Sequence, residues 1–540
     1  MLIAIVCFPW LMVMLLPWLR QTHWAGAVIP MAAVPALVLA MLPVGPPAAT
    51  VTGFTPGFQL GLDDTGRGFL LPTALLWLLA GWFATSRAAV AERREAFAAL
   101  WLVALGGNLL LILSQDLLAF YTGLAVMSFA AWGLVVHERS PEALAAGWLY
   151  LGMLLMAELA LITAVAWAVV SLPQDTPLGF EQLAQQAPPL LLVLLGLGFG
   201  IKLGALGLHS WLPRAHPAAP VPASAVLSGA MIKAGVLGCW RLLEHGALNL
   251  PTLGEALLLL GIAAGLYGVA MGLRSASPKA MLGWSSVSQM GLAIIVFGLA
   301  LAGATVWPAL LIFVFHHGLA KGALFLGAGL IPQLAGRWHR LAWAVLWLPA
   351  VSLAAAPFTG GALAKGAMSI AAEGGAEPAW LSPALSLSSA ATAALMWHFL
   401  WKLRTATRVA DPAPQELCHQ FMPYLVLVLA AAVLPWWSAW GNTVVAYVFS
   451  PTVIITGLWP LVLGVLVAVG LARVTFWQNQ TARSAAGSQR FSEPFHPKRG
   501  VQRLRGLRQL MVLERRLHGW PVVGRLLMCL LLPLALVLWW

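Results

Sequence analysis

Residues 199–240 read FGIKLGALGLHSWLPRAHPAAPVPASAVLSGAMIKAGVLGCW. Two lysines, Lys202 and Lys233, stand in runs of apolar and small residues that are otherwise typical of membrane-spanning helices. Between the two lysines, glycine and proline interrupt the apolar pattern and favour a break in the helix. A charged side chain at the centre of a bilayer costs about 2.5–3.5 kcal/mol. The stretch therefore predicts a broken helix and a second helix, each with an energetically costly lysine.

The composition of the whole chain agrees with a membrane location. Of the 540 residues, 61% are hydrophobic and 9% are charged, whereas a soluble domain carries about 25% charged residues. The four cysteines, Cys7, Cys239, Cys418 and Cys529, are scattered without ligand spacing, which predicts neither an iron–sulfur cluster nor a disulfide framework. We therefore expect no cofactor and no metal on this chain, and any redox chemistry to belong to a partner.

Hydrophobic runs long enough to span a bilayer recur along the sequence and predict about sixteen transmembrane helices. The first run lacks a preceding basic stretch and is expected to be a retained helix. Residues 50–67 alternate and are rich in glycine, which predicts a short hairpin at the membrane surface. The predicted spans are 2–19, 24–42, 68–85, 97–114, 117–136, 144–170, 188–209, 222–243, 253–273, 282–301, 305–331, 341–372, 383–402, 421–440, 452–473 and 521–540.

The basic residues give these spans an orientation. Of the 30 lysines and arginines, 24 lie in or beside the connections from an odd-numbered to the next even-numbered span, and only Arg67 and Arg241 lie on the opposite side. Cytoplasmic loops of membrane proteins carry the excess of basic residues. We therefore expect a bacterial cytoplasmic (inner) membrane protein with both termini on the outer face, and we assign the net charge of +12 to this bias and not to nucleic-acid binding. The basic stretch 498–518 favours an amphipathic helix on the cytoplasmic face or an ordinary basic stop before the last span.

Two spans are interrupted at related places, in FGIKLGALGLHSWLP (199–213) and SLAAAPFTGGALAKG (352–366). Broken helices that are buried in protein frequently come as a pair from an inverted repeat, although a kink used only for packing gives the same pattern. The two interrupted spans are the seventh and the twelfth, and an odd offset requires opposite orientations. The predicted fold class is all-α, with two inverted five-helix repeats. We expect N-terminal helices and the hairpin in 1–96, the first repeat in 97–243, the second in 253–405, and C-terminal helices with a basic cytoplasmic linker in 406–540.

Three further ionisable residues, Glu158, Lys321 and Lys365, stand inside apolar runs. Such residues usually mark an ion path. Spacing adds two histidines, because Lys202 and His209 are seven apart and His317 and Lys321 are four apart, so that each pair is expected to share a helix face. A neutral histidine both donates and accepts hydrogen bonds, which suits a proton path through water, although a single histidine equally suits packing.

At this point the chain resembles a known superfamily, the antiporter-like proton-translocating subunits. These include the large membrane-arm subunits of respiratory complex I, their homologues in group 4 membrane hydrogenases and formate hydrogenlyase, and the large subunits of Mrp-type sodium/proton antiporters. The resemblance covers roughly residues 60–400 and is most specific over 202–240. Three other stretches agree with it: GNLLLILSQDLLAFY (107–121), SPKAMLGWSSVSQMG (277–291) and FHHGLAKGALFLGAG (315–329), the last of which is similar to the hydrogenase branch.

The resemblance implies a role for individual residues of this chain. Lys202 matches the lysine of the first half-channel's broken helix, and Lys233 matches the lysine that relays protons towards the centre. Lys321, together with one of two adjacent histidines, matches the central relay. Lys365 matches the terminal lysine of the second broken helix. The two adjacent histidines are His316 and His317, and His209 matches the histidine before the WLP sequence.

One departure from the superfamily concerns the acidic partner of Lys202. The resemblance implies a glutamate in the fifth span, where this chain has Ala125, and Arg214 stands where many relatives have an acid. Glu158, in the sixth span, lies deep inside an apolar run. We therefore expect Glu158 to lie within one side-chain length, or one bridging water, of Lys202. The alternative is an impaired first half-channel and a protein that moves ions differently or not at all.

The sequence thus predicts a proton-translocating subunit of a larger membrane complex, with other subunits and lipid as its partners. Three kinds of coupled chemistry remain open: a redox or hydrogenase arm, sodium/proton antiport of Mrp type, and a carbonic-anhydrase-like partner that accumulates inorganic carbon. The shortage of acids within the spans disfavours a sodium site, because sodium prefers oxygen ligands. A scaffold without ion flow is the fourth possibility. No catalytic motif marks this chain itself as an enzyme.

The predicted orientation has a direct test in cysteine labelling of a cysteine-free background. We expect a membrane-impermeant thiol reagent added outside the cell to label Ala376→Cys and to leave Trp338→Cys unlabelled, because the two positions lie on opposite sides in the predicted topology. Permeabilised cells serve as the control, in which both positions should react. Outside labelling of position 338 and protection of position 376 would reverse the assigned orientation.

Overall fold

The structure is a computed structural model that describes residues 1–19, 26–43, 45–51, 57–171, 178–246, 248–373, 378–404, 414–439 and 443–486. Two compact units divide the chain at Gly464, and the residues discussed below belong to the first unit, Met1–Gly464. The predicted basic stretch 498–518 and the last predicted span, 521–540, lie outside the described residues.

Helices make up most of the described chain, as the sequence predicts. The N-terminal half contains α1 (Leu2–Leu19), α2 (Val28–Met31), α3 (Val34–Met41), α4 (Asp64–Ala84), α5 (Arg94–Leu113), α6 (Leu117–Val135), α7 (Pro141–Ser171), α8 (Phe180–Gln186), α9 (Pro189–Leu203), α10 (Leu212–Ala218), α11 (Val221–Val226), the π-helix η2 (Leu227–Met231) and α12 (Lys233–Leu243). The remainder contains α13 (Pro251–Leu273), α14 (Pro278–Leu301), α15 (Trp307–Leu330), the 3-10 helix η3 (Ile331–Gln333), α16 (Gly336–Leu353), α17 (Gly360–Glu373), α18 (Leu381–Arg404), α19 (Pro414–Ser438), α20 (Thr443–Val448) and α21 (Pro451–Ala486).

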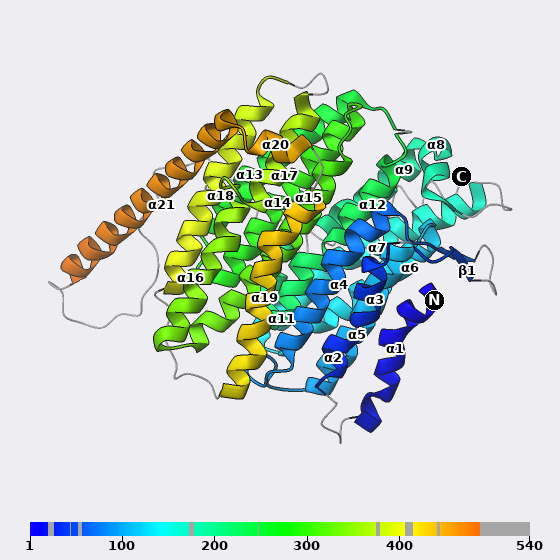
Figure 1. The fold of residues 1–540 in the computed structure, drawn as a ribbon, viewed down its shortest axis with the longest axis horizontal. Helices are drawn as coiled ribbons and strands as arrows, with labels where there is room; N and C mark the ends of the chain where they lie inside the picture. Colours follow the sequence, from blue (N-terminus) through cyan, green and yellow to red (C-terminus); the bar gives the residue numbers. More distant parts are fainter. Residues whose placement is uncertain are drawn as a thin grey trace. The chain divides into compact units, whose positions relative to one another are not determined.

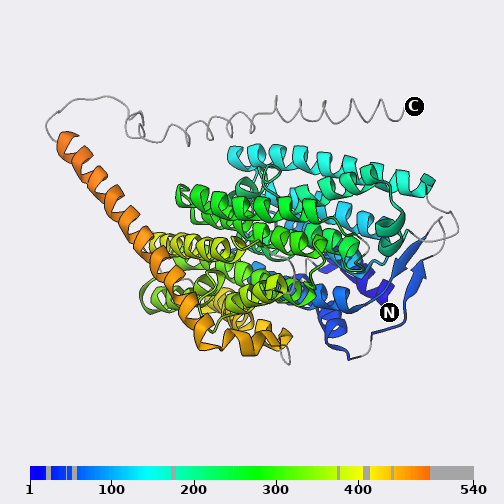
Figure 2. The same ribbon diagram turned by 90° about the horizontal axis from the view of Figure 1, so that it is seen from above.

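The predicted hairpin is present. Strands β1 (Ala49–Val51) and β2 (Phe58–Leu60) pair antiparallel, with Thr50 opposite Gln59, and Figure 2 shows them as two blue arrows. The backbone N–H of Gln59 donates to the carboxylate of Asp116 at 2.6 Å. Asp116 also caps α6 by accepting from the backbone N–H of Ala119 at 2.8 Å. One carboxylate thus attaches the hairpin to the start of α6.

Within the described residues, ten helical segments are long and apolar enough to cross a membrane. The count of sixteen spans therefore stays a prediction, as do the inverted repeats. Some predicted spans are divided in the structure: the run 24–42 contains the short helices α2 and α3. The ten segments are Asp64–Ala84, Arg94–Leu113, Leu117–Val135, Pro141–Ser171, Val221–Leu243, Pro251–Leu273, Pro278–Leu301, Trp307–Gln333, Glu416–Ser438 and Pro451–Gly470.

Small residues allow the central helices to approach closely. Helices α13 and α14 lie side by side (Figure 1), and glycines at seven-residue intervals on α13 face the backbone of α14. A Cβ atom on Gly254 or Gly261 would overlap a backbone oxygen of α14. Small residues at such contacts are typical of helix pairs in membranes, where close van der Waals packing replaces the hydrophobic effect.

Both predicted helix breaks are confirmed. Helix α9 ends at Leu203, where Gly204 adopts a left-handed φ of 74°, and the next helix begins at Leu212. Helix α16 ends at Leu353 and α17 begins at Gly360, with positive φ at Ala355 (59°) and Phe358 (63°) between them. Left-handed backbone at residues other than glycine is strained and persists only where surrounding contacts hold it. The two breaks carry Lys202 and, shortly after the second, Lys365.

The second break has a steric requirement at Gly361. Its backbone N–H donates to the hydroxyl of Ser352 at 3.3 Å, and a Cβ atom there would overlap the carbonyl oxygen of Ser352. We expect Gly361→Ala to destabilise the protein by about 1–3 kcal/mol, the usual cost of a forced contact in a packed core. Thermal unfolding of the detergent-solubilised protein measures this.

Gly196→Ala is the matched control for Gly361→Ala. Gly196 lies on the exposed side of α9, and no heavy atom lies within 4 Å of the position of its added Cβ atom. Because alanine has a higher helix propensity than glycine, this control should be neutral or slightly stabilising. Equal melting temperatures for the two variants would contradict the steric argument.

Candidate functional site

Lys202 and Glu158 form the predicted ion pair. The ammonium Nζ of Lys202, in the last turn of α9, donates to Oε1 of Glu158 on α7 at 2.7 Å. Both residues are buried, with 8% and 6% of their surface exposed. A buried charge without a partner is strongly unfavourable, and the pairing of opposite charges offsets part of this cost. The expectation that Glu158 would lie within reach of Lys202 is thus confirmed as a contact.

A serine that the sequence analysis missed completes the surroundings of Lys202. Ser128 lies on α6, one turn after Ala125, and its Oγ accepts a hydrogen bond from Lys202 Nζ at 2.7 Å. Ser128 is 2% exposed. Residues three apart lie on the same face of a helix. Ala125, where the resemblance implies a glutamate, was therefore the sequence signal for this face of α6.

A small cavity extends from Lys202 towards the next lysine. It has a volume of about 20 Å³, and its lining is mostly apolar, with Ser128, Tyr150 and Lys202 as polar members. Leu227, Met231 and Ile232 also line it. The cavity therefore joins the surroundings of the ion pair to η2 and to Ile232, which directly precedes Lys233.

Lys233 contacts His317, which lies 84 residues further along the chain. Lys233 Nζ lies 2.6 Å from Nδ1 of His317 on α15 and donates to the carbonyl oxygen of Ser228 at 2.6 Å. Because Ser228 belongs to η2, the wider turn of the π-helix supplies this acceptor. The hydroxyl of Ser228 also contacts that of Ser286 on α14 at 2.8 Å. Lys233 thus has one polar contact in η2 and one on α15.

The next residues lie on α15 and confirm the four-residue spacing of His317 and Lys321. Both are completely buried. Lys321 Nζ donates to the carbonyl oxygen of Leu282 on α14 at 2.9 Å. The adjacent His316 lies on another face of α15, and its Nδ1 is 3.3 Å from the hydroxyl of Ser352. His317 therefore contacts Lys233 at the start of α12, and His316 contacts Ser352 beside the second break.

Lys365 lies between two cavities. One has a volume of about 30 Å³ and is lined by His316, Gln289 and Thr392 as well as by Lys365. The other is a wider cleft of about 360 Å³ lined by Lys365, Pro357 and residues of α18, α20 and α21. Lys365 Nζ also donates to the Ser386 hydroxyl at 3.3 Å. The half-buried Lys365 thus lines both spaces.

These residues form a set that we name the central row. It begins at the Glu158–Lys202 pair and continues through Lys233 and His317 on facing helices. It also includes His316 and Lys321 of α15, and Lys365 of α17. Successive members belong to five helices, so that the fold assembles them from distant parts of the chain. The members are Glu158, Lys202, Lys233, His316, His317, Lys321 and Lys365.

His209 does not follow the helical spacing that the sequence suggested. The prediction that it shares a helix face with Lys202 is wrong, because α9 ends at Leu203 and His209 lies in the connection to α10. Its Nδ1 accepts from the backbone N–H of Gly207 at 3.1 Å. Its ring lies against Tyr267 and Trp284, each with a centroid distance of 5.5 Å. His209 is therefore placed by aromatic contacts with α13 and α14.

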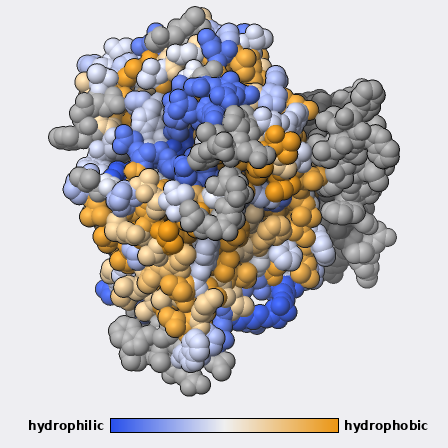
Figure 3. All heavy atoms as spheres, turned by 90° about the vertical axis from the view of Figure 1, so that its right-hand side faces the viewer, coloured by the Kyte–Doolittle hydropathy of each residue, from blue (hydrophilic) through white to orange (hydrophobic). Residues whose placement is uncertain are grey.

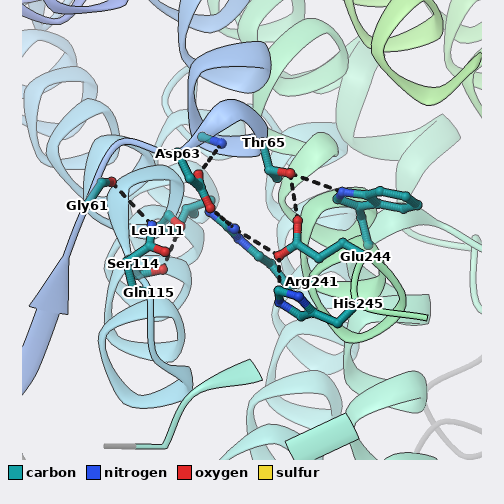
Figure 4. A network of polar contacts seen from close by, with 11 residues as sticks. Gly61, Asp63, Thr65, Leu111, Ser114, Gln115, Arg241, Glu244 and His245 are labelled. Carbon is teal, nitrogen blue, oxygen red and sulfur yellow. Dashed lines mark hydrogen bonds and ion pairs between the residues drawn. The ribbon is translucent and has the colours of Figure 1, made fainter. Parts of the chain in front are cut away.

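A second polar group, which the sequence analysis did not identify, surrounds Arg241. We name it the Arg241 cluster: Asp63, Thr65, Arg241, Glu244 and His245 (Figure 4). Arg241 pairs with Asp63 and, at 2.9 Å, with Glu244. The hydroxyl of Thr65 donates to Glu244 at 2.6 Å. The cluster joins the start of α4 to the end of α12.

The Arg241 cluster lines a polar cleft of about 890 Å³, seen as the blue hollowed area in Figure 3. Burial raises the pKa of the Asp63 carboxyl, but its hydrogen bond and ion pair with Arg241 and the backbone N–H of Gly66 outweigh this effect and hold the pKa below its usual value. Asp63 is therefore ionised near neutral pH and acts as a fixed partner of Arg241.

The sequence also matches a family of membrane subunits, described as "NADH:quinone oxidoreductase/Mrp antiporter, TM", over residues 114–389. This range is slightly more than half of the chain. The chain belongs to this family. The matched range contains every residue of the central row, whereas Asp63 and Thr65 of the Arg241 cluster lie before it.

Curated relatives within and around this family cover part of the chain. Hydrogenase-4 component B of Escherichia coli is 34% identical over 38% of this chain and 33% of its own length. NADH-quinone oxidoreductase subunit N of Desulforudis audaxviator is 30% identical over 52% of this chain and 58% of its own length. The chain thus spans between a third and somewhat more than half of the length of these relatives.

Solved structures extend the likeness in fold to nearly the whole chain. The Mrp complex from Dietzia matches over 99% of this chain and 62% of the matched chain, with a TM-score of 0.73 and 20% identity. An archaeal membrane-bound sulfane sulfur reductase, a respiratory membrane complex, matches over 84% of this chain and 99% of the matched chain, with a TM-score of 0.68 and 18% identity. At these identities the match establishes a shared fold.

The Arg241 cluster predicts a pH-dependent stability. Because the folded-state pKa of Asp63 is depressed, the stabilisation from its ion pair is present above the unfolded pKa and is lost as the pH falls through the folded value. We expect Asp63→Asn to lower the melting temperature at pH 7, and the difference from the wild type to shrink below about pH 4. The effect should be modest, because the side chain of Asp63 is 38% exposed.

Arg241→Met is the companion variant of Asp63→Asn. The side chain of Arg241 is only 3% exposed, and its loss leaves two carboxylates without their partner. We therefore expect a larger decrease in melting temperature at pH 7 than for Asp63→Asn. A wild-type advantage over Asp63→Asn that persists unchanged in acid would show that Asp63 acts through packing and not through its charge.

Proposed function

We propose that this chain conducts protons across the membrane along the central row, as one subunit of a larger membrane complex that couples the proton movement to a partner's chemistry. The observation that carries the proposal is the pairing of a buried glutamate with Lys202, followed by a second lysine in contact with a histidine. Each of these groups accepts and releases a proton without a cofactor. We further propose that no cofactor is bound by this chain.

The proposed step begins at the ion pair. The carboxylate of Glu158, 2.7 Å from the ammonium group of Lys202, favours the protonated form of that lysine. Movement of the two groups apart, or protonation of Glu158, removes this support, and the buried ammonium then releases its proton. The small cavity beside Lys202 is also lined by Met231 and Ile232, the residues directly before Lys233, and marks the direction that we propose for the proton.

The energy that the proposed step requires is comparable to a change of a few pKa units. A change of one pKa unit corresponds to about 1.4 kcal/mol, and moving one proton across a potential of 100 mV involves about 2.3 kcal/mol. A change of about two pKa units in the group that gives up the proton therefore matches the energy of one transfer against such a potential.

The partner's chemistry has three forms under this proposal: a redox arm, a hydrogenase, or a carbonic-anhydrase-like protein that accumulates inorganic carbon. The names of the relatives include hydrogenase and NADH-quinone oxidoreductase subunits, which favours the first two. The alternative is a sodium/proton antiporter subunit of Mrp type, which the shared fold with the Mrp complex supports. The central row has a single carboxylate, and sodium prefers several oxygen ligands, so we favour protons. We place the chain in a bacterial cytoplasmic membrane, with both termini outside.

Charge-removing variants of the ion pair test the proposal. We expect Glu158→Gln to reduce proton flux about as strongly as Lys202→Ala, by roughly tenfold, which corresponds to about 1.4 kcal/mol. The double variant should be little worse than either single variant, because both changes disable one unit. Proton flux is measured with the full chain and its co-purified subunits in vesicles that contain a pH-sensitive dye.

Glu142→Gln, at the start of the same helix α7 but exposed, is the matched control and should leave the flux unchanged. Normal flux in Glu158→Gln would contradict the proposed role of the pair. Proton flux that is driven by a sodium gradient in the wild type would favour the Mrp-type alternative.

A further inference from the structure

His216 is a fully buried histidine that the central row does not include. It lies on α10, in the segment that the sequence assigns to a cytoplasmic connection, and none of its surface is exposed. Within the described residues, neither of its ring nitrogens has a hydrogen-bond partner. Most buried polar side chains have such a partner, and the exceptions call for an explanation, of which catalytic function is one.

The position of His216 relates it to Lys321. Its ring stacks on Phe325, with centroids 4.5 Å apart, and Phe325 is one helical turn from Lys321 on α15. On α14, a Cβ atom at Gly283 would lie 3.2 Å from Cδ2 of His216, while the carbonyl oxygen of the preceding Leu282 accepts from Lys321. His216 and Lys321 therefore flank the same turn of α14.

Lys279 contacts the backbone directly after His216. The ammonium group of Lys279 donates to the carbonyl oxygen of Pro217 at 3.2 Å and also to that of Ala219, one and three residues after His216. Lys279 belongs to the first turn of α14, beside a connection that carries Arg274 and that the basic pattern places on the cytoplasmic side. Burial, and then the positive charges of Lys321, Lys279 and Lys233, hold the pKa of the His216 imidazole well below its usual value, so that the resting ring is neutral.

We propose that His216 carries protons between the cytoplasmic side at Lys279 and Lys321 of the central row, as an access route that does not pass through the Glu158–Lys202 pair. The inference rests on the proposed proton conduction. A neutral imidazole accepts a proton at one ring nitrogen and releases the proton from the other to the Lys321 amine, directly or through water. One proton passes, and the charge and composition of the ring are unchanged.

The surroundings of His216 favour this role over packing alone. A phenylalanine would stack on Phe325 equally well and would leave no buried nitrogen without a partner. The backbone of His216 is held separately, because its carbonyl oxygen accepts from the hydroxyl of Ser224 at 2.8 Å. Substitution of the ring therefore changes the proton-carrying group and leaves the anchor of this turn in place.

The test combines His216→Phe with the ion-pair variant Glu158→Gln in the full complex. Since Glu158→Gln closes only the first route, we expect it to retain a residual proton flux of roughly a tenth of the wild type. Addition of His216→Phe should reduce this residual proton flux to the level of vesicles without protein. His216→Gln, which keeps a polar side chain without titrating, should act in the same way and guards against a folding defect in the phenylalanine variant.

Phe325→Leu in the Glu158→Gln background is the matched control, because it removes the stacking partner and keeps the imidazole. It should leave the residual flux in place. An unchanged residual flux in the Glu158→Gln/His216→Phe variant would overturn the inference, as would a complete loss of flux in Glu158→Gln alone. A wild-type complex without flux would instead contradict the proposed function itself, so that the two failures are distinguishable.

Discussion

The structure depends on one constraint, which is that charges and interrupted backbone inside an apolar bundle need partners from other helices. Lys202 stands at the end of α9, where the helix stops and its last carbonyl groups lose their usual donors. The ammonium group is held by α6 and α7 through Ser128 and Glu158. The same principle operates at the second break, where the hydroxyl of Ser352 serves both the backbone of Gly361 and the ring of His316. Polar contacts thus fix the arrangement of helices whose apolar surfaces alone would permit several packings.

The sequence predicted those features whose energetic cost is visible within a short stretch of chain. Lysines in apolar runs, glycine and proline at the two breaks, and a lone glutamate in a span are each visible locally, and each was found where expected. Other features depend on residues far apart in the sequence. Arg241 and Asp63 are separated by 178 positions, and nothing in either neighbourhood distinguishes this pair from ordinary surface charges. Ser128 is similarly inconspicuous, because serine is common in membrane helices and gains meaning only from the lysine beside it.

The error at His209 has an instructive physical origin. Spacing of seven residues implies a shared helix face only while the helix continues, and the same glycines that predicted the break also ended the helix before His209. His317 and Lys321 keep their spacing because α15 is uninterrupted from Trp307 to Leu330. Periodicity and helix breaks therefore need to be considered together, since the second limits the range over which the first applies.

The π-helix η2 has a consequence for comparison with relatives. A turn of this kind holds one residue more than a turn of α-helix, and one extra residue rotates everything beyond it by about 100° around the helix axis. The five residues Leu227–Met231 thereby decide which side of α12 carries Lys233. A relative that lacks the wide turn would present the lysine at the same alignment column to a different neighbour. Equivalent lysines across the family are thus to be matched by the helix surface they occupy, and an alignment that looks gap-free through this segment can pair residues that face different helices.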